Sequence, residues 1–219
     1  MLWRKLKQAD HAILFLFEKF ADLVVLSLLW LVCSIPLVTA VPASAALYYA
    51  AVKSVRRGCD KVTTAFFHSF RSNLRQGMAL SAVVLAAAAI AAANLLLVEQ
   101  MPQGTSEKVF FAVFVRIVIL FLLAFCLYLG PVLSRFSKTM GDTIRFTVAL
   151  MLRHLGTTAA VFCMAAACIL SVWFYLIAVI VLPGVLAFCS SFFLERVFRK
   201  YMEPPAENIP PDQLPWYWQ

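Results

Sequence analysis

Long apolar stretches alternate with short basic segments along this chain. No charged residue occurs between positions 23 and 52, and the stretches 76–98, 109–132 and 157–182 are equally apolar except for Arg116. An α-helix needs about 20 consecutive apolar residues to cross a bilayer. The pattern therefore predicts an all-α fold, a polytopic transmembrane helix bundle.

We expect about six spans, at residues 21–37, 41–56, 76–98, 109–132, 157–182 and 184–199. Pro36 and Pro42 divide the first long stretch into two short helices, because proline lacks a backbone donor and disfavours a helical conformation in the preceding residue. Pro183 and Gly184 divide the last apolar stretch of the chain in the same way. Five spans are the alternative, in which the final segment only dips into the membrane.

Three segments combine an apolar stripe at helical spacing with basic residues on the opposite side: 2–20, 61–75 and 138–153. This pattern is typical of amphipathic helices that lie in the membrane surface. We therefore predict a single integral membrane domain over residues 1–202. Residues 203–219 contain five of the ten prolines and are predicted to form a cytoplasmic tail.

The charges predict an orientation. The chain is 63% hydrophobic and 14% charged, with 19 Lys and Arg and a net charge of +8. Seventeen of these cations lie before the first span or in 53–75, 134–154 and 195–203. Because cytoplasmic segments carry the excess of Lys and Arg, we expect all four segments and both termini in the cytoplasm. The charge then also attracts anionic lipid at the inner face, and nothing requires a nucleic-acid partner.

Two patterns concern helix packing. Residues 70–77 resemble 150–156, and each precedes a span rich in small residues, which indicates a weak internal repeat or convergence. Small residues recur at helical spacing in the third and fifth spans: Ala82, Ala86, Ala89, Ala93, Ala159, Cys163, Ala167 and Ser171. Small faces allow close helix approach in lipid, so we predict that these spans pack together. A homodimer interface is the alternative.

Several segments together resemble the YesL-type family of small bacterial membrane proteins. They are LLWLVCSIPLVT at 28–39 with AALYY at 45–49, AFFHSFRSN at 65–73 and LYLGPVL at 127–133. The resemblance covers nearly all of 15–202, although Ala40 stands where relatives often have glycine. It implies a multi-pass protein of the bacterial plasma membrane, often found beside ABC-type carbohydrate uptake systems. The family supplies no functional residues.

Motifs for self-contained catalysis are missing. The sequence has no phosphate-binding glycine loop, no serine-nucleophile elbow and no zinc-protease motif. We therefore expect no enzymatic activity, no cofactor and no metal site. A membrane-embedded enzyme would require His68, His154, Asp60 and Asp142 to converge.

Arg116 is the one cation predicted to lie deep within a span and not at its end, and an intramembrane arginine is a functional candidate by default. In an antiparallel hairpin of the third and fourth spans, Asn94 would lie close to its level. We predict an Arg116–Asn94 contact, assisted by Glu99. Binding of an anionic or polyhydroxy ligand and snorkelling to lipid headgroups are the alternatives.

Two further groups of residues are candidates. Pro36, Thr39 and Pro42 could form a broken-helix ion site, or a plain corner whose carbonyls bond to Thr39 and Ser44. A face on the basic helices is the predicted contact with a partner: His68, Arg71, Arg75, Arg145 and Arg153. We expect a non-enzymatic accessory or assembly protein, with sugar ABC importer components as partner. The alternatives are a small transporter or permease subunit and, last, a membrane enzyme.

Overall fold

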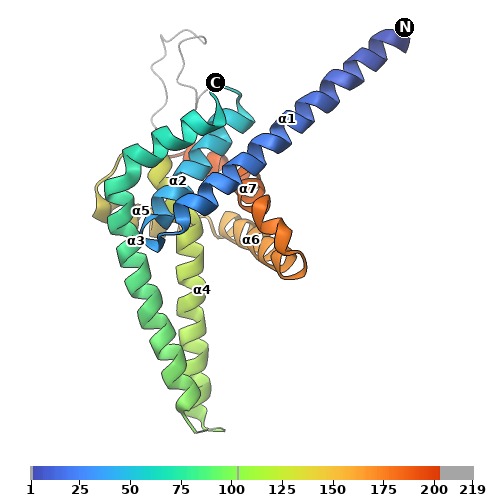
Figure 1. The fold of residues 1–219 in the computed structure, drawn as a ribbon. Helices are drawn as coiled ribbons and strands as arrows, with labels where there is room; N and C mark the ends of the chain where they lie inside the picture. The colour runs from blue at the N-terminus through green and yellow to red at the C-terminus, as the bar shows by residue number, and fades with distance from the viewer. Residues whose placement is uncertain (1, 103, 203–219) are drawn as a thin grey trace.

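The computed structural model describes residues 2–102 and 104–202, and within them it contains helices but no strand (Figure 1). The predicted tail at 203–219 lies outside the described residues. The elements in chain order are α1 (Leu2–Ser34), the 3₁₀ turn η1 (Leu37–Thr39), α2 (Ala40–Ala50), the π-helical segment η2 (Ala51–Arg56), α3 (Val62–Gln100), α4 (Ser106–Arg135), α5 (Met140–Arg153), α6 (Leu155–Phe174), the 3₁₀ turn η3 (Leu176–Ile180) and α7 (Leu182–Phe198).

Three of the described helices, α3, α4 and α6, are long and apolar enough to cross a membrane. The predicted spans 76–98 and 109–132 lie within α3 and α4, and α6 covers most of the predicted span 157–182. The other three predicted spans fall on α1, on α2 with η2, and on α7, and are not confirmed as crossings. The molecule is a helical membrane protein with at least these three candidate spans.

Two boundaries differ from the sequence prediction. Residues 2–20 and 21–37 were expected as separate helices, but α1 runs through both without a break and ends at Ser34, before Pro36. Residues 61–75 were expected as a separate interfacial helix, but they are the first turns of the 39-residue α3. In both places no proline interrupts the helix. A change from polar to apolar side chains does not by itself end a helix.

Helix α2 is the central element of the packed body. Eight of its 11 residues are buried, which is the opposite of a helix that faces lipid. Two glycines on its neighbours make room for it: a Cβ on Gly77 of α3 would lie 2.8 Å from the Pro42 ring, and one on Gly130 of α4 would lie 3.0 Å from the Ser44 Cβ. The absence of side chains therefore allows α3 and α4 to close on α2 from two sides.

The corner between α1 and α2 meets α3 near its middle. The Val41 amide donates to the Ser81 hydroxyl at 3.1 Å, and Pro42 packs on Gly77. The helical rise places Ser81 about 28 Å before Gln100, the last residue of α3. The α1–α2 hairpin therefore does not extend to the far end of the α3–α4 hairpin, which projects beyond the other elements in Figure 1. On that projecting part Ile90, Leu97, Phe110 and Ile117 are more than half exposed.

The α6–α7 connection begins earlier than predicted. The break was expected at Pro183 and Gly184, but α6 ends at Phe174 and α7 already begins at Leu182. Pro183 stands in the first turn of α7, where a missing amide donor costs no helical hydrogen bond. The turn is fixed by Ser27 of α1, whose hydroxyl accepts from the Gly184 amide at 2.8 Å and lies 3.1 Å from the Val181 carbonyl oxygen.

The predicted packing of the small-residue stripes is wrong. Helix α3 packs against α2 and α4, and makes no extensive contact with α6. The eight small residues are exposed: Ala82, Ala86, Ala89, Ala93, Ala159, Cys163, Ala167 and Ser171. The close approaches in this fold are made at Gly77, Gly130 and Gly184 instead.

Candidate functional site: a buried ion pair and two cavities

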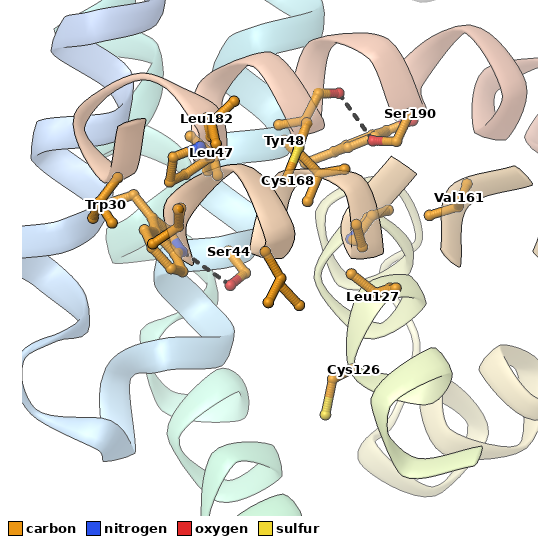
Figure 2. A pocket seen from close by; sticks show the side chains of 18 of the residues that line it. Trp30, Ser44, Leu47, Tyr48, Cys126, Leu127, Val161, Cys168, Leu182 and Ser190 are labelled. Carbon is orange, nitrogen blue, oxygen red and sulfur yellow. Dashed lines mark hydrogen bonds between the residues drawn. The ribbon is translucent and has the colours of Figure 1, made fainter. Parts of the chain in front are cut away.

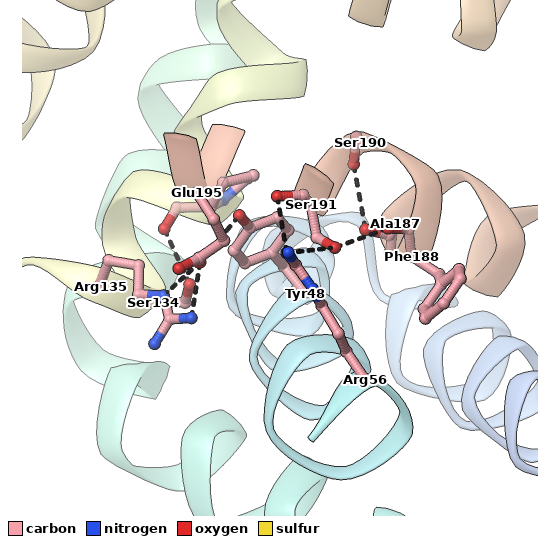
Figure 3. A network of polar contacts seen from close by, with 10 residues as sticks. Tyr48, Arg56, Ser134, Arg135, Ala187, Phe188, Ser190, Ser191 and Glu195 are labelled. Carbon is pink, nitrogen blue, oxygen red and sulfur yellow. Dashed lines mark hydrogen bonds and ion pairs between the residues drawn. The ribbon is translucent and has the colours of Figure 1, made fainter. Parts of the chain in front are cut away.

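The end of the bundle nearest the basic loops contains an ion pair that is almost completely buried. Arg135, the last residue of α4, approaches the Glu195 Oε1 atom through Nη2 at 2.6 Å and Nε at 2.7 Å. Their side chains are only 2% and 3% exposed. The Tyr48 hydroxyl of α2 donates to the same oxygen at 3.1 Å (Figure 3). Three helices, α2, α4 and α7, thus meet at one carboxylate oxygen.

The second carboxylate oxygen of Glu195 is buried and makes no hydrogen bond within the described residues. Further cations lie close by. Arg56 donates to the Ser191 carbonyl at 3.2 Å and stacks over the Phe192 ring at 4.3 Å. Burial lowers the pKa of Arg57, and the Glu195 charge acts against that shift. A buried charge is stable only when it is paired, so Glu195 balances a local excess of guanidinium groups.

An apolar cavity of about 580 Å³ lies on one side of this ion pair, among α1, α2, α4, α6 and α7. Figure 2 shows Trp30 and Ser44 on one wall, and Cys126, Leu127 and Val161 on another. Tyr48 lines the cavity with its ring and bonds to Glu195 with its hydroxyl. It therefore connects the apolar cavity to the ion pair.

A second, polar cavity of about 570 Å³ lies between α3 and the segment that connects α4 to α5. Its wall includes the cations of Arg135 and Lys138. It also includes a set of hydroxyl and amide side chains: Ser72, Asn73, Gln76, Ser134, Ser137 and Thr139. Gln76 crosses from α3 to donate to the Lys138 carbonyl at 2.9 Å and the Thr143 hydroxyl at 3.1 Å. The Arg135–Glu195–Tyr48 group thus contributes one side chain to the wall of each cavity, Tyr48 to the apolar one and Arg135 to the polar one.

The predicted contact between Arg116 and Asn94 is absent. Arg116 is exposed on α4, and the Asn94 amide donates at 2.8 Å to the Ile90 carbonyl of its own helix. Glu99 does not reach inward either, since its side chain is exposed and its carbonyl accepts from Lys108 at 3.1 Å. A side-chain amide can donate to a backbone carbonyl one turn earlier in its own helix. The spacing of residues in the sequence does not reveal that alternative.

The corner at Pro36, Thr39 and Pro42 has its polar groups occupied. The Thr39 hydroxyl lies 2.6 Å from the Cys33 carbonyl oxygen and 2.7 Å from that of Pro36. Ser44 donates to the Ala40 carbonyl at 2.8 Å. This is the geometry of the plain corner, in which side-chain hydroxyls satisfy the carbonyls that the break releases.

The residues of the predicted partner face are all exposed: His68, Arg71, Arg75, Arg145 and Arg153. The first three lie in the initial turns of α3 and the last two on α5, which covers the predicted helix 138–153 from Met140 onward. In the described part of the chain no ion pair engages any of the five. Their charges are therefore directed outward.

The four residues that an enzyme would need do not converge. Asp60 pairs with Lys53 at 2.6 Å, and His68 lies against the Tyr49 ring. Asp142 and His154 lie at opposite ends of α5, about 18 Å apart along the helix. Among the residues that the structure describes, no group of three His, Cys, Asp or Glu side chains could hold a metal ion.

Sequence reasoning missed the ion pair. The sequence pattern places Arg135 in the basic segment 134–154, Tyr48 in the predicted span 41–56 and Glu195 near the end of the predicted span 184–199, and it does not connect the three. One signal was present: Glu195 is the only acidic residue between residues 143 and 202, and it follows the apolar residues Phe192, Phe193 and Leu194 directly. A lone acid in such a context indicates a buried, paired group.

Comparison with known proteins gives one match. Residues 23–95, about a third of the chain, match the model of a family described as a protein of unknown function, DUF624, which is the family that includes the YesL-type proteins. The match runs from the second half of α1 through most of α3. It therefore covers Tyr48 but neither Arg135 nor Glu195. No curated protein and no solved structure matches the chain.

Proposed function

We propose that this chain is a multi-pass protein of the bacterial plasma membrane that acts as a non-enzymatic accessory or assembly factor for a carbohydrate importer of the ABC type. The importer link rests on the resemblance to YesL-type proteins. The observation that carries the accessory role is the exposed set of basic side chains on α3 and α5. Unpaired surface cations favour association with an acidic protein surface or with anionic lipid.

The proposed topology places every basic segment in the cytoplasm. Helices α3 and α4 cross and return, and the α1–α2 and α6–α7 hairpins each return to the side on which they begin. This holds whether those hairpins cross the bilayer or enter only one leaflet. Both termini are then cytoplasmic, in agreement with the distribution of Lys and Arg.

The test is quantitative mass spectrometry of the tagged protein, purified gently from its native membrane. We expect an importer permease or ATPase in near-stoichiometric amount. The double variant Arg71→Gln/Arg75→Gln should lose it, whereas Arg116→Gln should keep it, because Arg116 is an exposed cation far from the basic end. Recovery of the wild type without an importer subunit would contradict the proposal.

A small transporter is the second candidate, and a specific arrangement favours it. Tyr48 and Arg135, which both bond to Glu195, line the apolar and the polar cavity respectively, and ion pairs that repack are a known part of two-state transitions. If transport is the function, Glu195→Gln and Arg135→Gln should each abolish uptake when uptake is measured per amount of folded protein in the membrane.

A further inference from the structure

We propose that the apolar cavity among α1, α2, α4, α6 and α7 binds the acyl chain of a membrane lipid. This site is independent of the proposed accessory function. Its volume of about 580 Å³ is within the range of about 300–1,000 Å³ that small-molecule sites occupy.

The wall of the cavity offers a ligand no free hydroxyl or indole group among its side chains, and its two thiols, Cys126 and Cys168, form only weak hydrogen bonds. Trp30 Nε1 donates to Ser44 at 3.1 Å, and Ser190 donates to the Ala187 carbonyl at 3.1 Å (Figure 2). Ser44 in turn donates to the Ala40 carbonyl at 2.8 Å. The Tyr48 hydroxyl is held by Glu195. A sugar or another polyhydroxy ligand would lose its hydrogen bonds to water without replacement, and an apolar cavity does not hold water either.

Most of the remaining wall consists of leucine, valine and alanine side chains: Leu31, Leu47, Leu127, Val161, Ala165, Val172, Val179, Leu182, Leu186 and Ala187. An unfilled cavity of this kind forfeits the dispersion contacts of its lining atoms. An acyl chain supplies those contacts and requires no polar partner. The chemistry of the wall therefore selects a hydrocarbon chain.

The position of the cavity identifies the source of the chain. Two of its walls come from α4 and α6, both long and apolar enough to cross a membrane. A Thr158–Tyr128 hydrogen bond of 3.0 Å joins the start of α6 to α4. Further along α6, Ile169 lines the cavity and is 68% exposed, so the cavity opens there toward the bilayer. Lipid chains reach such an opening without passing through water.

The test is photo-crosslinking of the full chain, reconstituted into vesicles of phosphatidylethanolamine and phosphatidylglycerol that contain a phospholipid with a diazirine in one acyl chain. Lipids around the protein can label only exposed residues. We expect additional labels on Val161, Ala165 and Ala187, which line the cavity but are only 2%, 6% and 7% exposed. Labelling confined to exposed positions would overturn the proposal.

Two variants on α6 form a matched pair. Ala165→Phe places a phenyl ring inside the cavity, whereas Ala167→Phe places the same ring on the exposed side of the helix. We expect labelling of Val161 and Ala187 to fall about tenfold in Ala165→Phe, because the ring takes up the space of the chain, and to persist in Ala167→Phe. Equal labelling in both variants would overturn the proposal.

Competition in the wild type keeps the test decisive if Ala165→Phe does not fold. Excess oleate should suppress the labels on the buried positions and leave those on exposed positions unchanged, and excess glucose should suppress neither. Suppression by glucose, or no suppression by oleate, would contradict an acyl-chain site. Loss of the buried labels when the protein dimerises would assign the cavity to a second copy of the chain instead.

Discussion

Gly77 and Gly130 hold no side chain because α2 occupies the space that a side chain would need. The Pro42 ring and the Ser44 backbone stand within 2.8–3.1 Å of the missing Cβ atoms. A proline ring and a helix backbone cannot turn away as a flexible side chain can. These two glycines therefore set the distance at which α3 and α4 pack on the central helix.

Replacement of either glycine by alanine should destabilise the protein. Overpacking of this kind typically costs about 1–3 kcal/mol, so we expect Gly77→Ala and Gly130→Ala each to lower the midpoint of thermal unfolding in detergent. Gly156→Ala is the matched control, because it also changes a helical glycine but a Cβ there would meet nothing within 4 Å. An equal effect at all three positions would show that the contacts with α2 are unimportant.

The Arg135–Glu195 pair gives the second residue-scale prediction. Glu195→Gln leaves the Arg135 charge buried without its counter-charge, and loss of one partner of a buried pair typically costs about 3–5 kcal/mol. The double variant Arg135→Gln/Glu195→Gln removes both charges and should recover much of that loss. Thermal unfolding of the three proteins measures the difference. A double variant less stable than Glu195→Gln would contradict a paired role.

Sequence reasoning reached these residues unevenly. It singled out Arg116 because a cation inside an apolar run is visible by inspection, and the structure leaves that side chain exposed. It passed over Glu195 because burial of that group depends on α2 and α4, which bring Tyr48 and Arg135 from distant positions in the chain. A pairing between remote residues has no periodicity from which it could be predicted.

At the scale of the elements, Ser27 is the hydrogen-bonded link between α1 and the start of α7. Its hydroxyl accepts from the Gly184 amide and is within reach of the Leu23 and Val181 carbonyl oxygens. The link requires close contact, since a Cβ on Gly184 would lie 2.5 Å from the Leu23 carbonyl oxygen. The position of the α6–α7 turn thus depends on a residue more than 150 positions earlier.

Ser27→Ala should therefore weaken the docking of α7. It leaves the buried Gly184 amide without an acceptor, which typically costs about 1–3 kcal/mol. Ser171→Ala is the matched control, because Ser171 is exposed and bonds only within its own helix, to the Ala167 carbonyl at 2.8 Å. Proteolysis of the solubilised protein should cut the 175–181 turn faster in Ser27→Ala alone. Equal rates in both variants would contradict the link.

The elements themselves could largely be predicted, because local chemistry determines them. Pro36 ends α1, and the amphipathic pattern at 138–153 corresponds to α5. The depth of the α1–α2 hairpin could not be predicted in this way. It follows from Gly77, Gly130 and Ser81, which receive α2 at particular heights on α3 and α4. Those contacts join elements that hydropathy treats separately.

On the scale of the whole molecule, the packed body lies at one end of the α3–α4 hairpin. The buried ion pair, both cavities and the exposed basic residues belong to that body. The remainder of the hairpin exposes Ile90, Leu97, Phe110 and Ile117 along its length. Side chains of this kind are stable against lipid chains and not against water, in agreement with α3 and α4 as two of the three candidate spans.

The two ends of α3 should therefore lie on opposite sides of the membrane. Cys59, exposed just before α3, should react with a membrane-impermeant maleimide in inverted membrane vesicles but not in intact cells with a permeabilised outer envelope. Ser106→Cys, placed in a Cys59→Ala background at the start of α4, should show the reverse, and Cys59→Ala alone measures labelling of the other thiols. The region between residues 76 and 98 rises about 33 Å, enough to cross a hydrocarbon core of about 30 Å. Labelling of both positions from the same side would exclude a crossing by α3, whereas an exchange of the two sides would preserve the crossing and reverse only the orientation.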